Sequence, residues 1–288
     1  MKKVYMPATI ILLFCTVLQA QYKHEFSIYG GGGLSALKYD VTAGKQKNGF
    51  GGMAGLGYTF FFSPKWGLET GAELSFYNSK FNLDNLSSAY ITTDMDGDAF
   101  EFRNKVNNYE EKQNTMFVQI PLMLQFQTGN NHPFFASAGG KVGIPVRSKY
   151  KSSGAAILNS GYYSEEGHEY TTQEFMGFGT FTSKDADGDL KFKSAFFVST
   201  EAGIKWKLKE GLSLYTGAYL DYGLNDIYKK ENKAQFVNYN SIDPRNFAVN
   251  SVMNSRYTRN SEAHTFTDKV IPLSVGIKIR LSFGKGMK

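Results

Sequence analysis

Cysteine is almost absent from this sequence of 288 residues, and the single one, Cys15, lies close to the N-terminus. With one cysteine the chain has no intramolecular disulfide and no cluster of thiolates to hold a metal. Histidine is also scarce, with four residues, and neither a Gly-x-Ser-x-Gly nucleophile motif nor a metal-spaced histidine pair occurs. We therefore expect no catalytic residues, and the chain is not predicted to be an enzyme.

Long hydrophobic runs are missing as well. The only apolar run, Val4 to Leu18, is too short to cross a membrane as a helix. It follows two lysines and ends at Leu18-Gln19-Ala20, where a signal peptidase would cut. The sequence therefore predicts a cleaved signal peptide over residues 1–20, followed by a mature domain over residues 21–288.

A strong excess of charge of one sign is also lacking. The chain carries 32 Lys and Arg against 26 Asp and Glu, and two of its lysines precede the apolar run. This balance is too mild to indicate a nucleic-acid partner. The chain is instead rich in Gly, Phe and Tyr, with 30, 24 and 18 residues, a composition typical of an all-β chain with many turns.

Eight segments of the chain alternate apolar and polar residues with the two-residue period of a β-strand. In each of them the apolar face carries no charge, and the ionised side chains gather on the opposite face. The eight segments are His24 to Lys38, Gly49 to Phe62, Trp66 to Tyr77, Met116 to Gln127, Phe134 to Arg147, Ala195 to Leu208, Leu212 to Asn225 and Val270 to Phe283.

This separation of charge is what strands in a lipid bilayer require. A one-residue slip of the third segment would move Glu69 and Glu73 into hydrocarbon, where a charge costs about 2–4 kcal/mol for Arg or Lys and less for a carboxylate. Because lipid offers no hydrogen bonds to an open sheet edge, such strands span a membrane only as a closed barrel.

The connections between these segments alternate strictly between short and long. Alternate connections of an up-and-down barrel lie at opposite ends, so all the short ones share one end, as periplasmic turns do. The short connections are Ser63 to Lys65, Thr128 to His132 and Lys209 to Gly211, and the long ones are about Tyr39 to Asn48, Phe81 to Thr115, Ser148 to Ser194 and Asp226 to Lys269. The sequence therefore predicts an all-β, eight-stranded antiparallel up-and-down transmembrane β-barrel with long extracellular loops, in the outer membrane.

Three prolines fall inside the predicted strands, where each removes a hydrogen bond of the ladder. Pro121, Pro145 and Pro272 all occupy the charged face. We expect them near the loop end of the barrel, because bulges are tolerated at barrel rims.

Charged residues of both signs are predicted to face the barrel interior. An eight-stranded barrel is just wide enough for its side chains to fill, and an unpaired buried charge is costly. We therefore expect a plugged, salt-bridged lumen, with a narrow ion path as the alternative. The predicted charge network comprises Glu69, Glu73, Lys141, Glu201, Lys205, Asp221, Lys278 and Arg280.

Two stretches give the sequence a family resemblance. The segment MFVQIPLMLQF from Met116 to Phe126 and the last predicted strand, VIPLSVGIKIRLSFG, resemble PorT-type outer-membrane β-barrel domain proteins of Gram-negative bacteria. The architecture also resembles that of small OmpA- or OmpX-type barrels. The resemblance implies the barrel fold and allows a role as an accessory of protein export, but it transfers no functional residue.

An Asp-rich motif occurs twice in the predicted outer loops. Three carboxylates at alternate positions suit Ca²⁺, although neither copy has the glycine and glutamate spacing of an EF-hand. The alternative interpretation is an Asp-Gly hairpin turn that continues the strands, with Thr92 and Thr93 opposite Phe100 and Phe102. The candidate calcium ligands are Asp94, Asp96 and Asp98 in DMDGD, and Asp185, Asp187 and Asp189 in DADGD. No other cofactor is predicted.

The expected function is that of a non-enzymatic surface barrel, structural or adhesive, which presents its loops to an extracellular protein or glycan. Tyrosine and asparagine recur in the loops, and such surfaces often bind proteins. A small porin for ions or solutes and an accessory of outer-membrane protein export are the alternatives. We expect a monomer in contact with outer-membrane lipid.

Overall fold

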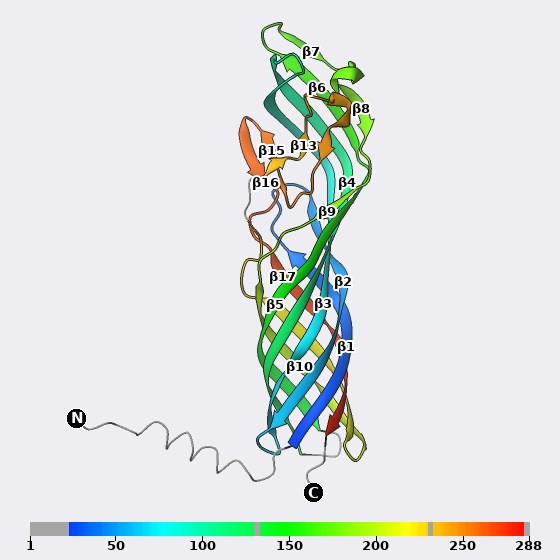
Figure 1. Ribbon diagram of the computed structural model, residues 1–288, viewed down its shortest axis with the longest axis vertical. Helices are drawn as coiled ribbons and strands as arrows, with labels where there is room; N and C mark the ends of the chain where they lie inside the picture. The colour runs from blue at the N-terminus through cyan, green and yellow to red at the C-terminus, as the bar shows by residue number, and fades with distance from the viewer. Residues whose placement is uncertain (1–22, 130–132, 230–232, 285–288) are drawn as a thin grey trace, which may run out of the picture.

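The computed structural model describes residues 23–129, 133–229 and 233–284, and β-structure dominates them. The strands are drawn out along one long axis (Figure 1). Within the described residues, none of the helices has the length and apolarity needed to span a bilayer. The predicted signal peptide, residues 1–20, lies outside the described residues.

Eight of the described strands pair antiparallel around a closed ring, which forms the lower part of the molecule in Figure 1. The β4–β5 pairing and the β1–β17 pairing, in which Phe26 lies opposite Phe283, complete the ring. Taken around the ring, the strands are β1 (Lys23–Lys38), β2 (Lys45–Phe61), β3 (Trp66–Thr93), β4 (Ala99–Gln127), β5 (Phe134–Ser153), β10 (Ala195–Lys209), β11 (Leu212–Gly223) and β17 (Ile271–Gly284).

The eight predicted segments correspond one for one to the ring strands. At the end of the ring with the short turns, every predicted strand boundary lies within one residue of the observed one. At the opposite end two strands run far beyond the prediction, because β3 continues to Thr93 rather than Tyr77, and β4 begins at Ala99 rather than Met116.

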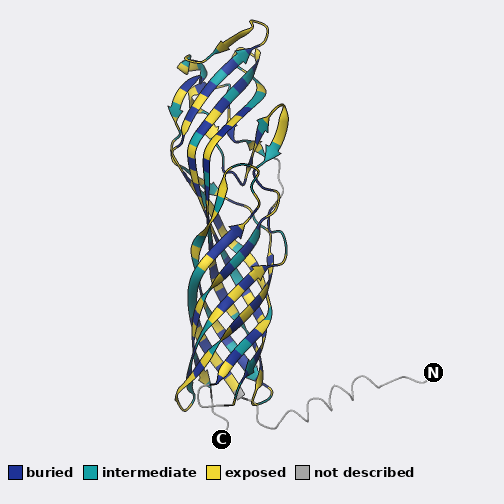
Figure 2. Cartoon of the chain, turned by 180° about the vertical axis from the view of Figure 1, so that it is seen from behind, coloured by how far each residue is buried: buried dark blue, intermediate teal, exposed yellow. Residues whose placement is uncertain are grey.

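Buried and exposed residues alternate along the ring strands in the lower part of the molecule, which we call the band (Figure 2). The exposed large residues there are apolar, and the charged residues of the network are buried. Phe26, Leu122 and Ile277 are 59–67% exposed, whereas Glu69 and Arg280 are at most 2% exposed. This arrangement suits a ring whose outer wall contacts lipid. The outward aromatic residues beside the short turns are Phe62, Trp66, Phe134, Trp206 and Phe283.

Above this band the chain forms a folded part where long loops were predicted, and for residues 81–115 the loop prediction is wrong. This stretch is the upper half of a β3–β4 hairpin that stays paired up to Thr93 and Ala99. Residues 148–194 contain the short strands β6 (Ala156–Tyr163), β7 (His168–Tyr170), β8 (Gly179–Thr182) and β9 (Ala186–Asp189), and the 3-10 helix η2 (Glu174–Met176).

We use the term head for the described residues of 81–115, 148–194 and 226–269. In the head, β6 pairs with the upper part of β4, and β9 pairs with the upper part of β5. Residues 226–269 pack against this sheet and contain β12 (Ala234–Gln235), β13 (Val237–Asn238), η3 (Pro244–Asn246), β14 (Ala248–Val249), β15 (Ser255–Arg259) and β16 (Glu262–Thr265).

The alternation along β4 reverses inside the head, between Val106 and Tyr109. In the band Ile120 and Leu122 point outward and are 56% and 59% exposed, and Gln119 is buried. In the head Phe100 and Phe102 are buried, whereas Lys105 is exposed. The apolar face thus points outward in the band and inward in the head, as expected for a strand that passes from lipid into water.

The three strand prolines do not lie at the same height along the ring. Pro145 lies beside a register shift between Met116 and Phe117, and Pro272 is the second residue of β17, so both lie near the head. Pro121 is instead buried deep in the ring opposite Lys141, and its predicted place at the rim is wrong. The hydroxyl of Thr70 donates a hydrogen bond of 2.9 Å to the Pro121 carbonyl beside the gap in the ladder.

Candidate functional site

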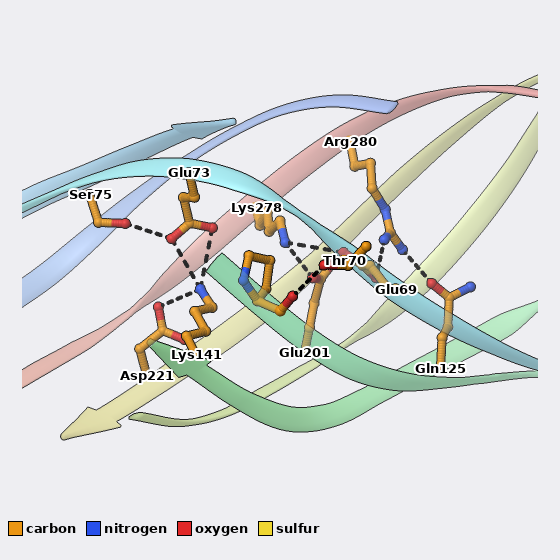
Figure 3. A network of polar contacts seen from close by, with 11 residues as sticks. Glu69, Thr70, Glu73, Ser75, Gln125, Lys141, Glu201, Asp221, Lys278 and Arg280 are labelled. Carbon is orange, nitrogen blue, oxygen red and sulfur yellow. Dashed lines mark hydrogen bonds and ion pairs between the residues drawn. The ribbon is translucent and has the colours of Figure 1, made fainter. Parts of the chain in front are cut away.

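The ring encloses a layer of ion pairs, in which Arg280 on β17 holds the Glu69 carboxylate on β3 (Figure 3). A second guanidinium nitrogen of Arg280 donates to the Gln125 side-chain oxygen at 2.8 Å. The same guanidinium stacks 4.2 Å from the centre of the Tyr215 ring, a cation–π contact that packs its face. Arg280 is thereby fixed across the lumen by groups from three other strands.

Lys278, two residues before Arg280, belongs to the same layer. Its ammonium lies 2.8 Å from Glu201 on β10 and 4.0 Å from Glu69. It also lies 4.1 Å from the centre of the Tyr29 ring. Gly55 makes room for this ring, because a Cβ at that position would lie 2.6 Å from the Tyr29 Cζ atom.

A second group of ion pairs lies closer to the head, where one lysine ammonium contacts two carboxylates. Lys141 on β5 lies 3.1 Å from Glu73 on β3 and 2.9 Å from Asp221 on β11. The Ser75 hydroxyl donates to Glu73 at 2.5 Å. All three charged side chains are at most 5% exposed, so each of them depends on these partners for its solvation.

At the short-turn end, the structure adds a carboxylate that the sequence analysis missed. Glu25 on β1 accepts hydrogen bonds from Lys205 at 2.8 Å, Tyr215 at 2.6 Å and Ser282 at 2.8 Å. The signal was present in the sequence, because Glu25 alternates with the outward Phe26. The structure thus brings all eight predicted network residues into the ring interior, and Lys205 is the one whose carboxylate partner was not predicted.

An aromatic layer covers the ion pairs on the side of the head. Tyr77, Phe117 and Phe197 are at most 2% exposed, and their ring centres lie 5.5–6.1 Å apart. Gln119 donates a 3.3 Å hydrogen bond to the Tyr77 hydroxyl and so links this layer to the polar one below. Paired charges and rings therefore occupy the middle of the lumen, and a cavity of about 510 Å³ lies at its short-turn end, beside Glu25, Gln127 and Lys205.

The head has its own buried core of aromatic residues. Phe100 stacks on Tyr163 at 5.1 Å, and its ring centre lies 5.5 Å from that of Phe178 and 5.1 Å from that of Tyr239. Phe100 and Phe178 are at most 2% exposed. Because these residues come from β4, β6 and two separate connecting segments, their packing holds the head together.

A buried carboxylate joins the segment 226–269 to β4. Glu111 accepts hydrogen bonds from Gln113 at 2.8 Å and Tyr109 at 2.7 Å on its own strand. It also accepts them from the Ser251 hydroxyl at 2.9 Å and the Val252 backbone N–H at 3.0 Å. Burial raises the pKa of Glu111 above its ordinary value. The sequence analysis missed it because it falls in a predicted loop.

The two Asp-rich motifs adopt different structures. Residues 94–98 form the predicted hairpin turn, with Thr92 opposite Phe100. Asp94 accepts hydrogen bonds there from the backbone N–H groups of Asp96 and Asp98, each at 3.0 Å, and from the Tyr163 hydroxyl at 2.8 Å.

The second motif is not a turn. Residues 186–189 form β9 along the edge of β5, with Asp187 opposite Lys151 and Asp189 opposite Lys149. Asp185 accepts a hydrogen bond from the Gly154 N–H at 3.0 Å. Among the residues that the structure describes, no group of three or more His, Cys, Asp or Glu is placed to hold a metal ion. Calcium binding stays a prediction.

Comparisons with known proteins give a family match and distant structural similarity. A crystal structure of the outer membrane protein OprG from Pseudomonas aeruginosa is 12% identical with a TM-score of 0.38, and the alignment covers 94% of this chain and 100% of OprG. The crystal structure of Ail, the attachment invasion locus protein of Yersinia pestis, in complex with the heparin analogue sucrose octasulfate is 13% identical with a TM-score of 0.29. That alignment covers 91% of this chain and 99% of Ail.

The search among curated proteins gives no match. The family model described as "Outer membrane protein beta-barrel domain" matches residues 19–229, which is most of the chain. The protein therefore belongs to the outer-membrane β-barrel domain family.

Proposed function

We propose that this outer-membrane barrel is a non-conducting, non-enzymatic anchor, and that its folded head binds a protein or glycan outside the cell. The observation that carries the proposal is the aromatic core around Phe100, which holds strands and connections of the head in one arrangement. An ordered head presents a fixed surface, and a fixed surface loses less conformational entropy on binding than free loops do.

The filled lumen argues against the small-porin alternative. A path for ions or solutes needs water-lined space, whereas the interior here holds paired charges beneath the layer of Tyr77, Phe117 and Phe197. The plugged interior supports the resemblance to OmpA- or OmpX-type barrels. The PorT-type resemblance and the export role stay hypotheses.

Shortening the β3–β4 hairpin tests the binding role. Leu83 and Tyr109 are cross-strand partners, so an Asn-Gly turn that replaces residues 84–108 closes the hairpin just above the band. Cells that display the full-length or the shortened protein are compared for adhesion to immobilised matrix proteins and to a glycan array. A heat-dependent gel shift verifies that both barrels are folded.

The full-length protein should adhere to at least one of these surfaces, and the shortened one should not. Equal adhesion by both, or adhesion by neither, contradicts the binding role of the head.

A further inference from the structure

The outer wall of the protein changes from apolar to basic where β3, β4 and β5 leave the apolar band. One cross-strand row consists of Phe76, Met116 and Arg147. Two residues further along the strands, the next row ends in Lys149, and the row after that consists of Lys80, Lys112 and Lys151. The basic residues of these rows are exposed.

A cavity of about 670 Å³ lies at this change. Phe76 and Met116 line it on the side of the apolar band, and Arg147, Lys149 and Lys151 line it on the side of the head. Its wall is therefore apolar at one end and cationic at the other. An amphiphile with an anionic headgroup has this same division of chemistry.

The local fold explains why the cavity forms here. The β4–β5 register shifts between Met116 and Phe117, opposite Pro145, so the two strands lose their regular pairing. Thr115, next to this shift, also lines the cavity.

The charges around the cavity are predominantly positive. Asp187 is the carboxylate among the lining residues, against three cations. Asp189 lies 3.9 Å from Lys149, but both side chains are well exposed, and such an ion pair contributes little. A phosphate therefore meets an excess of positive charge at this point.

We propose that this cavity binds the phosphate-bearing headgroup of a lipid in the outer leaflet. Arg147, Lys149 and Lys151 contact the phosphate, and Phe76 and Met116 contact the first part of the acyl chains. Arginine favours phosphate because its planar guanidinium donates two parallel hydrogen bonds. The continuity of the cavity with the lipid-facing band favours a lipid over a soluble phosphate compound.

The test uses protein extracted from outer membranes, exchanged into neutral detergent and titrated with bisphosphorylated lipid A, with the complex followed by native mass spectrometry. The triple variant Arg147→Gln/Lys149→Gln/Lys151→Gln is compared with a control, Lys38→Gln/Lys184→Gln/Arg245→Gln. The control removes three exposed cations that do not line the cavity. A heat-dependent gel shift checks that each barrel is folded.

We expect the cavity variant to bind lipid A at least about tenfold more weakly than the wild type, and the control variant to bind it as the wild type does. Dephosphorylated lipid A should bind the wild type as weakly as lipid A binds the cavity variant. The proposal is overturned by equal losses in the two variants, by no loss in the cavity variant, or by glucosamine phosphate competing as strongly as lipid A.

Discussion

Lys141 lies inside the ring between two carboxylates, those of Glu73 and Asp221. Replacing it by methionine keeps most of the side-chain volume and removes the charge. Two buried carboxylates then face each other without a cation, and the expected loss in the free energy of unfolding is about 3–5 kcal/mol. Urea unfolding in detergent micelles, followed by the gel shift, measures this loss.

The matched control for Lys141→Met is Lys184→Met, because Lys184 is exposed in the head. It should change stability by no more than about 0.5 kcal/mol. Adding Asp221→Asn to Lys141→Met should restore part of the lost stability, since one of the two unpaired charges disappears. A loss no larger than that of the control means that Lys141 does not stabilise the lumen.

Glu111 gives the head a pH dependence of defined sign. Because burial raises its pKa, the folded head holds the proton to higher pH than the unfolded chain does. The folded head is therefore most stable below the ordinary glutamate pKa of about 4.3, and it loses stability as the pH rises from there towards the raised pKa.

Thermal unfolding of the head between pH 4 and pH 7 measures this loss, and Glu111→Gln should flatten the profile. A head that becomes more stable over this range in the wild type, or an unchanged slope in Glu111→Gln, contradicts the assignment.

At the scale of elements, the β3–β4 hairpin depends on its turn. Asp94 accepts hydrogen bonds from two backbone N–H groups of the turn and from Tyr163 on β6. Asp94→Ala removes all three, and we expect the turn to lose about 0.5–2 kcal/mol of local stability. Amide hydrogen exchange at residues 95–98 should be faster by the factor that corresponds to this loss. Asp243 is an exposed carboxylate of the head, so the control variant Asp243→Ala should leave the exchange rate at these residues unchanged.

The same residue allows a direct test of calcium binding. Asp94 already accepts three hydrogen bonds, so Ca²⁺ at this turn would have to displace some of them. If the predicted site exists, millimolar CaCl₂ raises the thermal stability of the head or protects residues 94–98 from proteolysis, and Asp94→Ala abolishes the effect. No change in either measurement rules out calcium at the turn.

The ring strands were predictable because each keeps one alternation phase over most of the band; on β5 it changes at the head end, where Val146 and Arg147 are both exposed. The upper β3–β4 hairpin was not predictable, because the alternation phase changes once on each of its two strands. On β3 the buried residues Leu83 and Leu86 lie three positions apart, and on β4 so do Val106 and Tyr109. Asn108, between the last two, has a positive φ of 57°. These irregularities interrupt the two-residue period, so the sequence pattern ends there although the strands continue.

The interior charges were predictable for a similar reason, since a charge within a strand of the band has only one face available to it. Their partners were not, because alternation gives the face of Lys141 but not the strand that lies across the lumen from it. Glu111 and the aromatic core around Phe100 could not be predicted from the sequence. Their burial depends on long-range contacts with residues 226–269, which only the fold of the head reveals.

For the whole molecule, the closed ring and the head have opposite exteriors. The ring exposes apolar side chains to lipid and encloses charges, whereas the head has a mostly polar surface, with exposed apolar residues such as Ile91 and Ile242, and encloses aromatic rings. The change occurs at the level of Phe76 and Arg147, where we also place the lipid headgroup. Ion pairs occupy the middle of the ring and aromatic rings the core of the head, which is why we propose the outer surface rather than the lumen as the functional part.

Single-channel recording in a planar bilayer tests the filled lumen most directly. The folded barrel should show no steady conductance at any voltage that the bilayer withstands, because ion pairs and the aromatic layer of Tyr77, Phe117 and Phe197 occupy its interior. The heat-dependent gel shift confirms folding in the same preparation. A steady conductance whose ion selectivity changes in Glu73→Gln would contradict the account and identify the protein as a small channel.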